Sequence, residues 1–239
     1  AMTGAKVALL DLNEDAAKKH ADDITAKGYI AKGYKCNVLE KASVQAARDQ
    51  IAADFGTCDI LINGAGGNNA RANTDKEYFE MADLEDDTVT FFDLDESGVE
   101  MVFNLNFIGT LLPTQAFARQ MVGRPGCNIL NISSMNAYLP LTKIPAYSGS
   151  KAAVTNFTQW LAVHFSKVGI RVNAIAPGFI MTEMTDKLPD EVKEGWYKQI
   201  PLRRGGTPED VAKVALFLAS DLSSYVSGQV IHCCGAMNC

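Results

Sequence analysis

A serine, a tyrosine and a lysine are spaced so that all three could act on one substrate oxygen. Tyr147 and Lys151 are four residues apart in a segment whose apolar residues recur at helical spacing, so the two side chains share one helix face. Ser134 precedes Tyr147 by thirteen residues and follows a short apolar segment, Cys127–Ile132, that is typical of a buried strand. We therefore expect Ser134 to approach the same point from the carboxyl end of that strand.

This arrangement suits acid–base chemistry on an alcohol or a ketone. A phenol has a pKa of about 10, and a nearby cation lowers that pKa by favouring the phenolate. Tyr147 could then exchange a proton with a substrate oxygen while a hydride leaves or arrives at the carbon, and Ser134 could hydrogen-bond that oxygen. The alternative is a surface tyrosine and lysine one turn apart, but the spacing of Ser134 and the strand before it favour the catalytic interpretation.

Together with three further motifs, these residues resemble the short-chain dehydrogenase/reductase family over almost the whole chain. The motifs are Asn63-Gly64-Ala65-Gly66 after the predicted strand Cys58–Ile62, Asn106 in the predicted long helix Gly98–Val122, and Pro177-Gly178 after the predicted strand Ile170–Ala176. Gly64 stands where the family usually has a second Asn. The resemblance implies an α/β fold with a doubly wound, Rossmann-like parallel sheet, and an enzyme that uses NAD(P) to interconvert alcohols and carbonyls.

The resemblance also assigns roles to single residues. It implies that the catalytic residues are Asn106, Ser134, Tyr147 and Lys151, and that Ser134, Asn136, Lys143 and Tyr147 contact the substrate. In the family, the residue matching Asn106 bends its helix and positions a water that links the lysine to solvent. The alternative for Asn106 is a buried amide satisfied by local backbone.

The cofactor would lie along the carboxyl ends of the strands. The residues implied to contact it are Asp11, Asn37, Val38, Asn63, Gly64, Ala65, Tyr147, Lys151, Pro177, Gly178, Ile180 and Thr182. Asp11 ends the predicted strand Lys6–Leu10, where a carboxylate can accept hydrogen bonds from ribose hydroxyls and repel a 2′-phosphate, which favours NAD over NADP. The alternative is that Asp11 or Asn13 caps the predicted helix Glu14–Lys27.

The chain departs from the family before Asp11, where the glycine-rich phosphate-binding loop and the strand preceding it have no counterpart. In the family's sheet that strand lies between the strands matching Lys6–Leu10 and Cys58–Ile62. Its absence would leave backbone groups unpaired, each at a cost of about 1–3 kcal/mol when buried. We therefore expect the printed chain to be incomplete or truncated, and to bind NAD weakly as it stands. The alternative is that another of its segments fills the gap.

A second departure is an acidic insertion at about residues 67–97 in what is otherwise expected to be one domain, residues 1–239. Loops of this length are usually functional or disordered. Two interpretations remain open: a solvated surface insertion, or a flap beside the substrate-binding site. Other predicted elements are helices at Ser43–Phe55, Tyr147–Val168, Thr185–Gln199 and Glu209–Ala219, and strands at Lys35–Val38 and Val226–Ile231.

Composition limits the partners. The net charge of −6 gives no basic footprint for nucleic acid, and no run of eighteen apolar residues predicts a membrane span. The first residues show no secretory signal pattern, and six scattered cysteines are typical of reduced, buried thiols in a cytoplasmic protein. Cys233 and Cys234 with Cys239 lack the spacing of zinc ligands, so no metal is expected.

Different parts of the chain resemble enzymes with different substrates. Residues 63–165 look like the D-mannonate oxidoreductases (fructuronate reductases) of this family, whereas residues 182–229 look more like 3-oxoacyl-[acyl-carrier-protein] reductases. We favour the first because that segment surrounds the catalytic residues. A catalytically silent binding protein on the same scaffold is the third interpretation, favoured only without the cofactor loop. Relatives often pair their two long helices across a dimer interface, so the resemblance implies a homo-oligomer, either a dimer or a homotetramer.

Overall fold

The computed structural model describes residues 1–141, 143–183 and 185–237, in which helices and parallel strands alternate along much of the chain. The strands are β1 (Val7–Asp11), β2 (Ala31–Lys35), β3 (Ile60–Asn63), β4 (Asn128–Ile132), β5 (Arg171–Pro177) and β6 (Val230–Cys233). The α-helices are α1 (Glu14–Thr25), α2 (Lys41–Phe55), α3 (Glu96–Phe103), α4 (Gly109–Met121), α5 (Pro145–His164), α6 (Asp190–Gln199) and α7 (Pro208–Ala219). None of these helices is both long enough and apolar enough to cross a membrane.

The strands form two parallel sheets. β1 pairs with β2, and β3, β4, β5 and β6 pair in that order. Among the described residues no strand pairs with the remaining edge of β1 or of β3. The predicted doubly wound α/β fold is therefore confirmed, and none of the described segments fills the place of the family's first strand.

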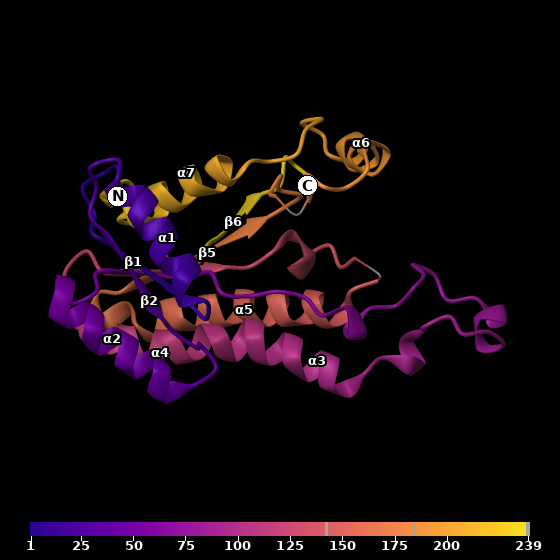
Figure 1. The fold of residues 1–239 in the computed structure, drawn as a ribbon, viewed down its shortest axis with the longest axis horizontal. Helices are drawn as coiled ribbons and strands as arrows, with labels where there is room; N and C mark the ends of the chain where they lie inside the picture. Colours follow the sequence, from indigo (N-terminus) through magenta and orange to yellow (C-terminus); the bar gives the residue numbers. More distant parts are fainter. Residues whose placement is uncertain (142, 184, 238–239) are drawn as a thin grey trace.

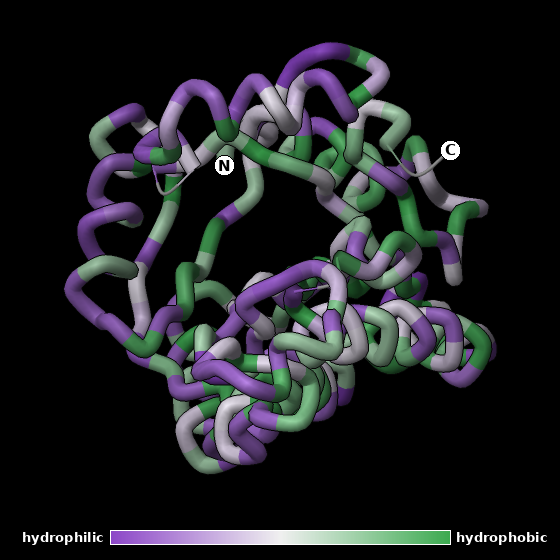
Figure 2. The backbone as a smooth tube through the Cα atoms, turned by 90° about the vertical axis from the view of Figure 1, so that its right-hand side faces the viewer, coloured by the Kyte–Doolittle hydropathy of each residue, from purple (hydrophilic) through white to green (hydrophobic). Residues whose placement is uncertain are grey.

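Helices cover both faces of the strands. In Figure 1, α1 and α7 lie above the strands while α2, α4 and α5 lie below them, and the end-on view in Figure 2 shows helical coils on both sides. Strand β4 explains this layering because its successive side chains point to opposite faces. Ile129 packs in one buried cluster with Met121 of α4 and Leu161 of α5, whereas Leu130 packs in another with Leu218 of α7. The apolar residues of β4 therefore face two separate cores, one on each side of the sheet.

Parallel pairing brings the carboxyl ends of the strands to one edge. Asp11 is the last residue of β1, Asn63 of β3, Ile132 of β4 and Pro177 of β5. This edge therefore gathers segments that are far apart in the sequence, and the polar residues singled out above follow or end these strands.

Two predicted strands are wrong in their positions. The strand predicted at Lys35–Val38 lies earlier, at β2, because helix α1 packs directly onto Gly33: a Cβ there would lie 2.5 Å from a backbone atom of Ala17. The strand predicted at Val226–Ile231 begins only at Val230, since Val226 accepts a hydrogen bond from the Asn173 side chain at 2.9 Å. Both shifts follow from contacts between distant segments, which a local pattern does not contain.

Two predicted helices also differ. The single helix predicted at Gly98–Val122 is interrupted by a π-helical turn, Asn104–Ile108, that joins α3 to α4. The helix predicted from Thr185 begins instead at Asp190, directly after Pro189. In the first of these helices, the π-helical turn widens the backbone at the place where Asn106 stands.

The acidic insertion contains three short 3₁₀ turns, Ala70–Ala72, Met81–Leu84 and Phe91–Asp93. We call residues 74–95 the arm. The base of the arm is fixed to the loop before α5, because the Thr74 amide donates to the Lys143 carbonyl oxygen at 3.0 Å. Beyond this base the arm, magenta in Figure 1, extends past the ends of α3 and α5. Its base thus adjoins a predicted substrate residue, while the rest projects into solvent.

Candidate active site

Ser134, Tyr147 and Lys151 meet at the carboxyl end of β4. The Ser134 side chain lies near enough to the Tyr147 side chain to lower the pKa of the phenol. The Lys151 ammonium nitrogen lies 5.8 Å from the centre of the Tyr147 ring and donates to the Ile132 carbonyl oxygen at 2.9 Å. Helix α5 presents the tyrosine and the lysine one turn apart, and β4 ends two residues before the serine. The structure therefore brings Ser134, Tyr147 and Lys151 together, as predicted from their spacing in the sequence.

Burial sets the acid–base properties of this group. Loss of solvent raises the pKa of Tyr147 above its ordinary value, and the nearby Ser134 side chain acts in the opposite direction. Burial also lowers the pKa of Lys151 to about 8. The expectation of a lowered pKa for Tyr147 is wrong for the chain by itself, because desolvation is the largest influence and outweighs the opposing effect of Ser134. A tyrosine that keeps its proton at neutral pH suits proton donation to a carbonyl oxygen.

Asn106 is fully buried in the π-helical turn and fastens that turn to the segment after β3. Its side-chain oxygen accepts from the Gly67 amide at 2.9 Å, and its nitrogen donates to the Gly67 carbonyl and to the Ser150 hydroxyl, each at 2.9 Å. The Asn106 side-chain amide is thus hydrogen-bonded to backbone, as the alternative interpretation of this residue expected. The backbone groups, however, belong to Gly67, which is distant in the sequence. It links the turn after β3 to helix α5.

Gly66 has a positioning function that was not foreseen. A Cβ at this residue would lie 2.6 Å from the Asn106 side-chain oxygen and 3.1 Å from the Lys151 ammonium. Only a glycine therefore lets these two polar groups approach the turn as they do. The sequence indicated the turn Asn63–Gly66 through its resemblance to the family motif. That motif did not indicate a role for Gly66, the last residue of the turn.

A second unforeseen feature is a chain of buried amides beneath the site. Asn63 donates to the Asn131 side-chain oxygen at 2.8 Å and to the Thr114 hydroxyl at 2.9 Å. Asn131 in turn donates to the Thr158 hydroxyl at 2.9 Å. The Asn63 side chain, expected at the cofactor, therefore ties β3 to β4 and α4. Gly64 and Ala65 follow it with exposed surface.

The residues expected around adenosine lie at the end of the two-stranded sheet. Asp11 is exposed and accepts a hydrogen bond from the Asn13 amide at 2.7 Å, whereas the cap of α1 is Asn13, which accepts from Ala16 at 3.2 Å. The Asn37 amide is already engaged, because it accepts from the Leu39 amide at 3.1 Å and donates to Glu40 at 2.8 Å. Val38 packs against the first residue of α4, because its side chain lies 3.0 Å from where a Cβ of Gly109 would stand.

The residues expected around nicotinamide form a loop after β5. Pro177 ends β5, and the Gly178 amide donates to the Cys233 carbonyl at 3.0 Å. Ile180 forms a bridge with Gly206, and the Thr182 amide donates to the Thr185 hydroxyl at 2.6 Å. The loop is therefore held on both sides. Met184 and Thr142 lie outside the described residues.

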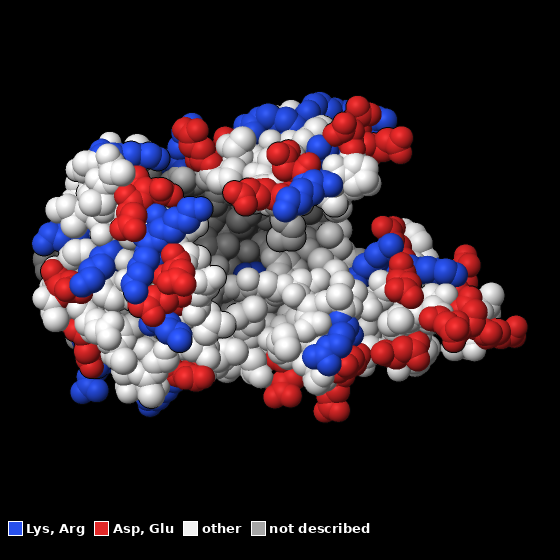
Figure 3. Space-filling view, in the orientation of Figure 1, with Lys and Arg blue, Asp and Glu red and all other residues white. Residues whose placement is uncertain are grey.

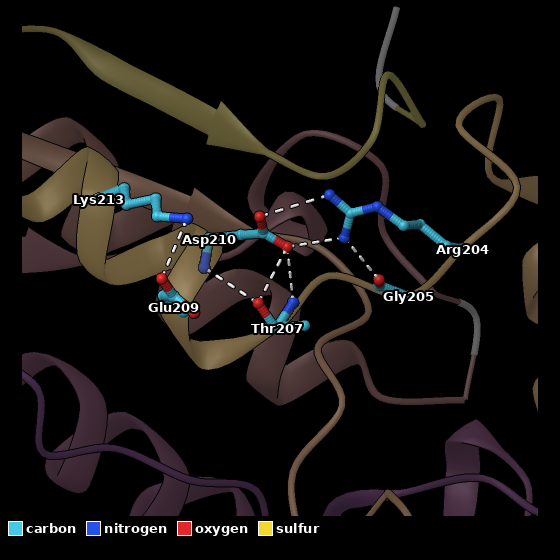
Figure 4. Close-up of polar contacts among 6 residues, drawn as sticks. All are labelled: Arg204, Gly205, Thr207, Glu209, Asp210 and Lys213. Carbon is cyan, nitrogen blue, oxygen red and sulfur yellow. Dashed lines mark hydrogen bonds and ion pairs between the residues drawn. The ribbon is translucent and has the colours of Figure 1, made fainter.

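The start of α7 anchors this loop. Figure 4 shows Asp210 receiving hydrogen bonds from Arg204 and from the backbone and hydroxyl of Thr207. The Thr207 hydroxyl accepts from the Asp210 amide at 3.2 Å, so the two residues form a capping box. Gly206, directly before this box, is the residue that pairs with Ile180. The cap of one helix thus positions the neighbouring loop.

The two further substrate residues lie in different places. Asn136 is buried beside Ser134, whose hydroxyl accepts from the Asn136 amide at 3.2 Å. Lys143 instead lines a cleft of about 480 Å³ at the base of the arm, together with Ala70, Arg71, Asn73, Thr74, Asp75, Val89, Asp93 and Asp95. Figure 3 shows that the face in view is hollowed between the upper and lower helical layers. No group of three metal-ligating side chains occurs among the described residues.

The arrangement fits the two ends of a dinucleotide better than its diphosphate. Asp11 stands at one end of the strand edge and the loop Pro177–Thr182 at the other. The helix after β1, however, begins with Glu14 and Asp15, whose charges repel a phosphate at its N-terminus. The turn after β3 leads only into a three-residue 3₁₀ turn. Among the described residues, the adenosine and nicotinamide ends therefore have candidate partners and the diphosphate has none at a helix start.

Comparisons with known proteins agree with this geometry. A family model described as "Enoyl-(Acyl carrier protein) reductase" matches residues 1–238. An "Uncharacterized oxidoreductase" of Haemophilus influenzae is 55% identical over 239 residues, which cover 97% of this chain and 84% of the relative. The chain belongs to the short-chain dehydrogenase/reductase family. By that membership it is an oxidoreductase.

Relatives and solved structures within this family differ in substrate and cofactor. A 3-oxoacyl-[acyl-carrier-protein] reductase of Aquifex aeolicus is 37% identical, covering 99% of this chain and 89% of the relative. A crystal structure with bound NAD, of a Haemophilus influenza protein proposed to be a D-mannonate oxidoreductase, is 54% identical with a TM-score of 0.94, covering 100% of this chain and 88% of the other. A gluconate 5-dehydrogenase of Burkholderia cenocepacia, with NADP and tartrate, is 29% identical with a TM-score of 0.83, covering 99% and 87%.

Proposed function

We propose that this chain is an NAD-dependent oxidoreductase that interconverts a secondary alcohol and a ketone on a sugar acid, D-mannonate and D-fructuronate. The observation that carries the chemistry is the group at the end of β4 formed by the buried Ser134 and Lys151 and the partly buried Tyr147. The substrate is supported by the 54% identity to the NAD-bound structure and by the tartrate in the gluconate 5-dehydrogenase. Tartrate, like mannonate, is a hydroxy acid.

The cofactor would contact residues at both ends of the strand edge. Asp11 would accept hydrogen bonds from the adenosine ribose, and its carboxylate would repel the 2′-phosphate of NADP. The loop Pro177–Thr182 would face the nicotinamide. When bound there, NADH would supply the hydride for ketone reduction, and NAD⁺ would accept it in alcohol oxidation.

Each of Ser134, Tyr147 and Lys151 has a distinct function in ketone reduction. Tyr147 donates its proton to the ketone oxygen, while Ser134 holds the same oxygen by a hydrogen bond. The Lys151 ammonium, 5.8 Å from the tyrosine ring, stabilises the phenolate that remains. Asn106 and Gly66 position Lys151 by fixing the turn after β3 against α5. Asn136 and Lys143 would contact the hydroxyls or the carboxylate of the sugar acid.

A second candidate function is reduction of a 3-oxoacyl group on an acyl-carrier protein. The Aquifex aeolicus reductase favours it, since it matches 99% of the chain, and so does the resemblance of residues 182–229 to such reductases. Both candidates use the same proton donor and differ only in the substrate.

The test is NADH oxidation at saturating NADH with fructuronate and with an acetoacetyl thioester, for the unaltered chain and for Tyr147→Phe. We expect turnover of fructuronate, and a loss of about 10²–10⁴-fold in Tyr147→Phe because the proton donor is removed. Tyr225→Phe, at a fully exposed tyrosine, is the matched control and should keep full activity. Undiminished turnover by Tyr147→Phe would contradict the mechanism. Preference for the thioester would favour the second function, and inactivity with all ketones would favour a silent binding protein.

A further inference from the structure

The cleft at the base of the arm holds cations and carboxylates and adjoins the candidate active site. Its volume is about 480 Å³, and Arg71 and Lys143 are among the residues that line it. Ala72, the next residue after Arg71, is fully buried in one cluster with Tyr147. Lys143 lies four residues before Tyr147, and a helical side chain leans toward the turn that precedes its own Cα. The Tyr147 side chain is therefore directed toward the end of α5 that Lys143 precedes.

Arg71 is fixed against helix α3 by its own chain. Its carbonyl oxygen accepts from the Asp95 amide at 3.2 Å, and its Nη1 donates to the Asp95 carboxylate at 3.2 Å. The Arg71 amide donates to the Asn69 side chain at 2.9 Å, which caps the 3₁₀ turn Ala70–Ala72. A Cβ at Gly98 of α3 would lie 3.0 Å from the Cβ of Arg71, so the glycine lets this turn pack closely. A side chain held in this way loses less entropy when it binds a ligand.

The two cations of the cleft keep hydrogen-bond donors available. Within the described part of the chain, only Nη1 of the Arg71 guanidinium has a partner, which leaves the edge formed by Nε and Nη2. Such an edge can donate to both oxygens of one carboxylate. The Lys143 ammonium has no ion pair or hydrogen bond with any described residue, since only its backbone carbonyl is engaged, by Thr74. Both side chains are thus free to bind an anionic group.

Two carboxylates of the cleft use only one oxygen each within the chain. Asp75 accepts from the Val89 amide at 2.9 Å, and Asp93 accepts from the Thr90 amide at 3.0 Å and from its hydroxyl at 2.7 Å. The hydrogen bonds from Thr90 hold the pKa of the Asp93 carboxyl below its ordinary value, so this group is ionised at neutral pH. The second oxygen of each carboxylate has no donor among the described residues. A hydroxyl group of a ligand can supply one.

We propose that Arg71 and Lys143 bind the carboxylate of the sugar acid in this cleft, while Asp75 and Asp93 accept hydrogen bonds from its hydroxyls. This assignment rests on the function proposed above and deepens it by naming Arg71 as the residue that selects an acid. A ligand that matches both kinds of side chain must carry a negative charge together with hydroxyl donors, as a sugar acid does. The acyl chain of a 3-oxoacyl group carries neither, so the cleft favours the sugar acid over the second candidate substrate.

The first test compares fructuronate with its methyl ester, which lacks the negative charge, in NADH oxidation at saturating NADH. Arg71→Gln should raise KM for fructuronate about 10–100-fold, because a hydrogen bond between two charged groups is lost. It should change kcat little, since the carboxylate contact is the same before and during the reaction, and KM for the methyl ester should not change. Arg71→Lys should recover part of the loss, because it keeps the charge without the bidentate edge.

Two further variants complete this comparison. Lys143→Gln should raise KM for fructuronate in the same way and leave the methyl ester unaffected. Arg48→Gln is the matched control, because Arg48 also pairs with a single aspartate, Asp49, but lies on α2 and does not line the cleft. It should leave the kinetics of both substrates unchanged. Circular dichroism checks that all variants are folded.

Binding without turnover separates this assignment from the proposed function. Calorimetric titration of D-mannonate into Tyr147→Phe, with NAD present, measures affinity in a variant that lacks the proton donor. Adding Arg71→Gln should weaken that affinity about 10–100-fold. D-Mannitol, which has the hydroxyls but no carboxylate, should not distinguish the two variants.

The outcomes for the cleft and for the enzyme differ. Turnover of fructuronate with an unchanged KM in Arg71→Gln would overturn the assignment and leave the proposed function standing. Equal losses for fructuronate and its methyl ester would also overturn it, because Arg71 would then act through the fold. Binding of mannonate that depends on Arg71, without reduction of any ketone, would support the cleft and refute the proposed function. Mannonate binding that is absent or independent of Arg71 would overturn the assignment.

Discussion

At the scale of single residues, the geometry of the site depends on a glycine, which has no side chain. Gly66 lies between the Asn106 oxygen and the Lys151 ammonium, and a methyl group there would approach both too closely. Each neighbour is itself fixed: Asn106 by Gly67 and Ser150, and Lys151 by the Ile132 carbonyl. Neither can move away without breaking a hydrogen bond.

We therefore predict that Gly66→Ala lowers activity strongly and lowers the free energy of unfolding by about 1–3 kcal/mol, the usual cost of overpacking. Gly64→Ala is the matched control for stability in the same turn, because a Cβ at Gly64 has no atom within 4 Å and should leave the free energy of unfolding unchanged. Urea unfolding measures stability in both variants, and NADH oxidation measures the activity of Gly66→Ala. Equal free energies of unfolding in the two variants, or full activity of Gly66→Ala, would show that Gly66 has no positioning function.

At the scale of elements, the start of α7 shows how a local signal fixes a helix end. Thr207 and Pro208 predict a helix start from the sequence alone, and the structure confirms it. Hydrogen bonds from Arg204 and Thr207 hold the pKa of the Asp210 carboxyl well below its ordinary value. The folded state thus favours the ionised carboxylate, and this contribution to stability is present at pH values above the unfolded pKa of about 3.9.

We predict that Thr207→Ala lowers the free energy of unfolding by about 0.5–2 kcal/mol at pH 7, as for other N-caps. Asp210→Asn should also destabilise the protein at pH 7. Its difference from the unaltered chain should shrink as the pH falls below about 4, because the carboxylate then loses its advantage in the folded state. Glu209→Gln is the control, since the exposed Glu209–Lys213 pair contributes little. Urea unfolding between pH 3 and pH 7 measures all three, and a pH-independent Asp210→Asn difference would contradict the prediction.

The features that could be predicted from the sequence are those set by local signals, such as helix caps and the spacing of residues along a helix. The spacing of Tyr147 and Lys151 placed both on one helix face, and a strand end placed Ser134 beside them. The position of β2 was missed because Gly33 is set by the packing of α1, and the raised pKa of Tyr147 was missed because it comes from burial. Burial and close packing depend on segments distant in the sequence, so periodicity and spacing do not report them.

At the scale of the whole molecule, the described strands form two sheets with no backbone pairing between them. The unit of β1, α1 and β2 is held to the rest by side-chain packing, in which Tyr34 and Cys36 meet Val44 of α2 and Phe117 of α4. Strands β4 and β5, in contrast, are hydrogen-bonded on both sides. The smaller sheet therefore has the weaker attachment.

We predict that the amides of β1 and β2 exchange with deuterium faster than those of β4 and β5, because they can open without disturbing the larger sheet. Hydrogen exchange followed by mass spectrometry measures this at peptide resolution. The amides of α5, packed in the larger core, provide the internal reference for slow exchange. Equal protection of both sheets would mean that the side-chain cluster alone couples them into one cooperative unit.

The two central strands of the larger sheet have no free edge, because β4 and β5 are each paired on both sides. A free strand edge can recruit an extended segment of another molecule and begin irregular aggregation, so these two strands are protected from that process while the chain is folded.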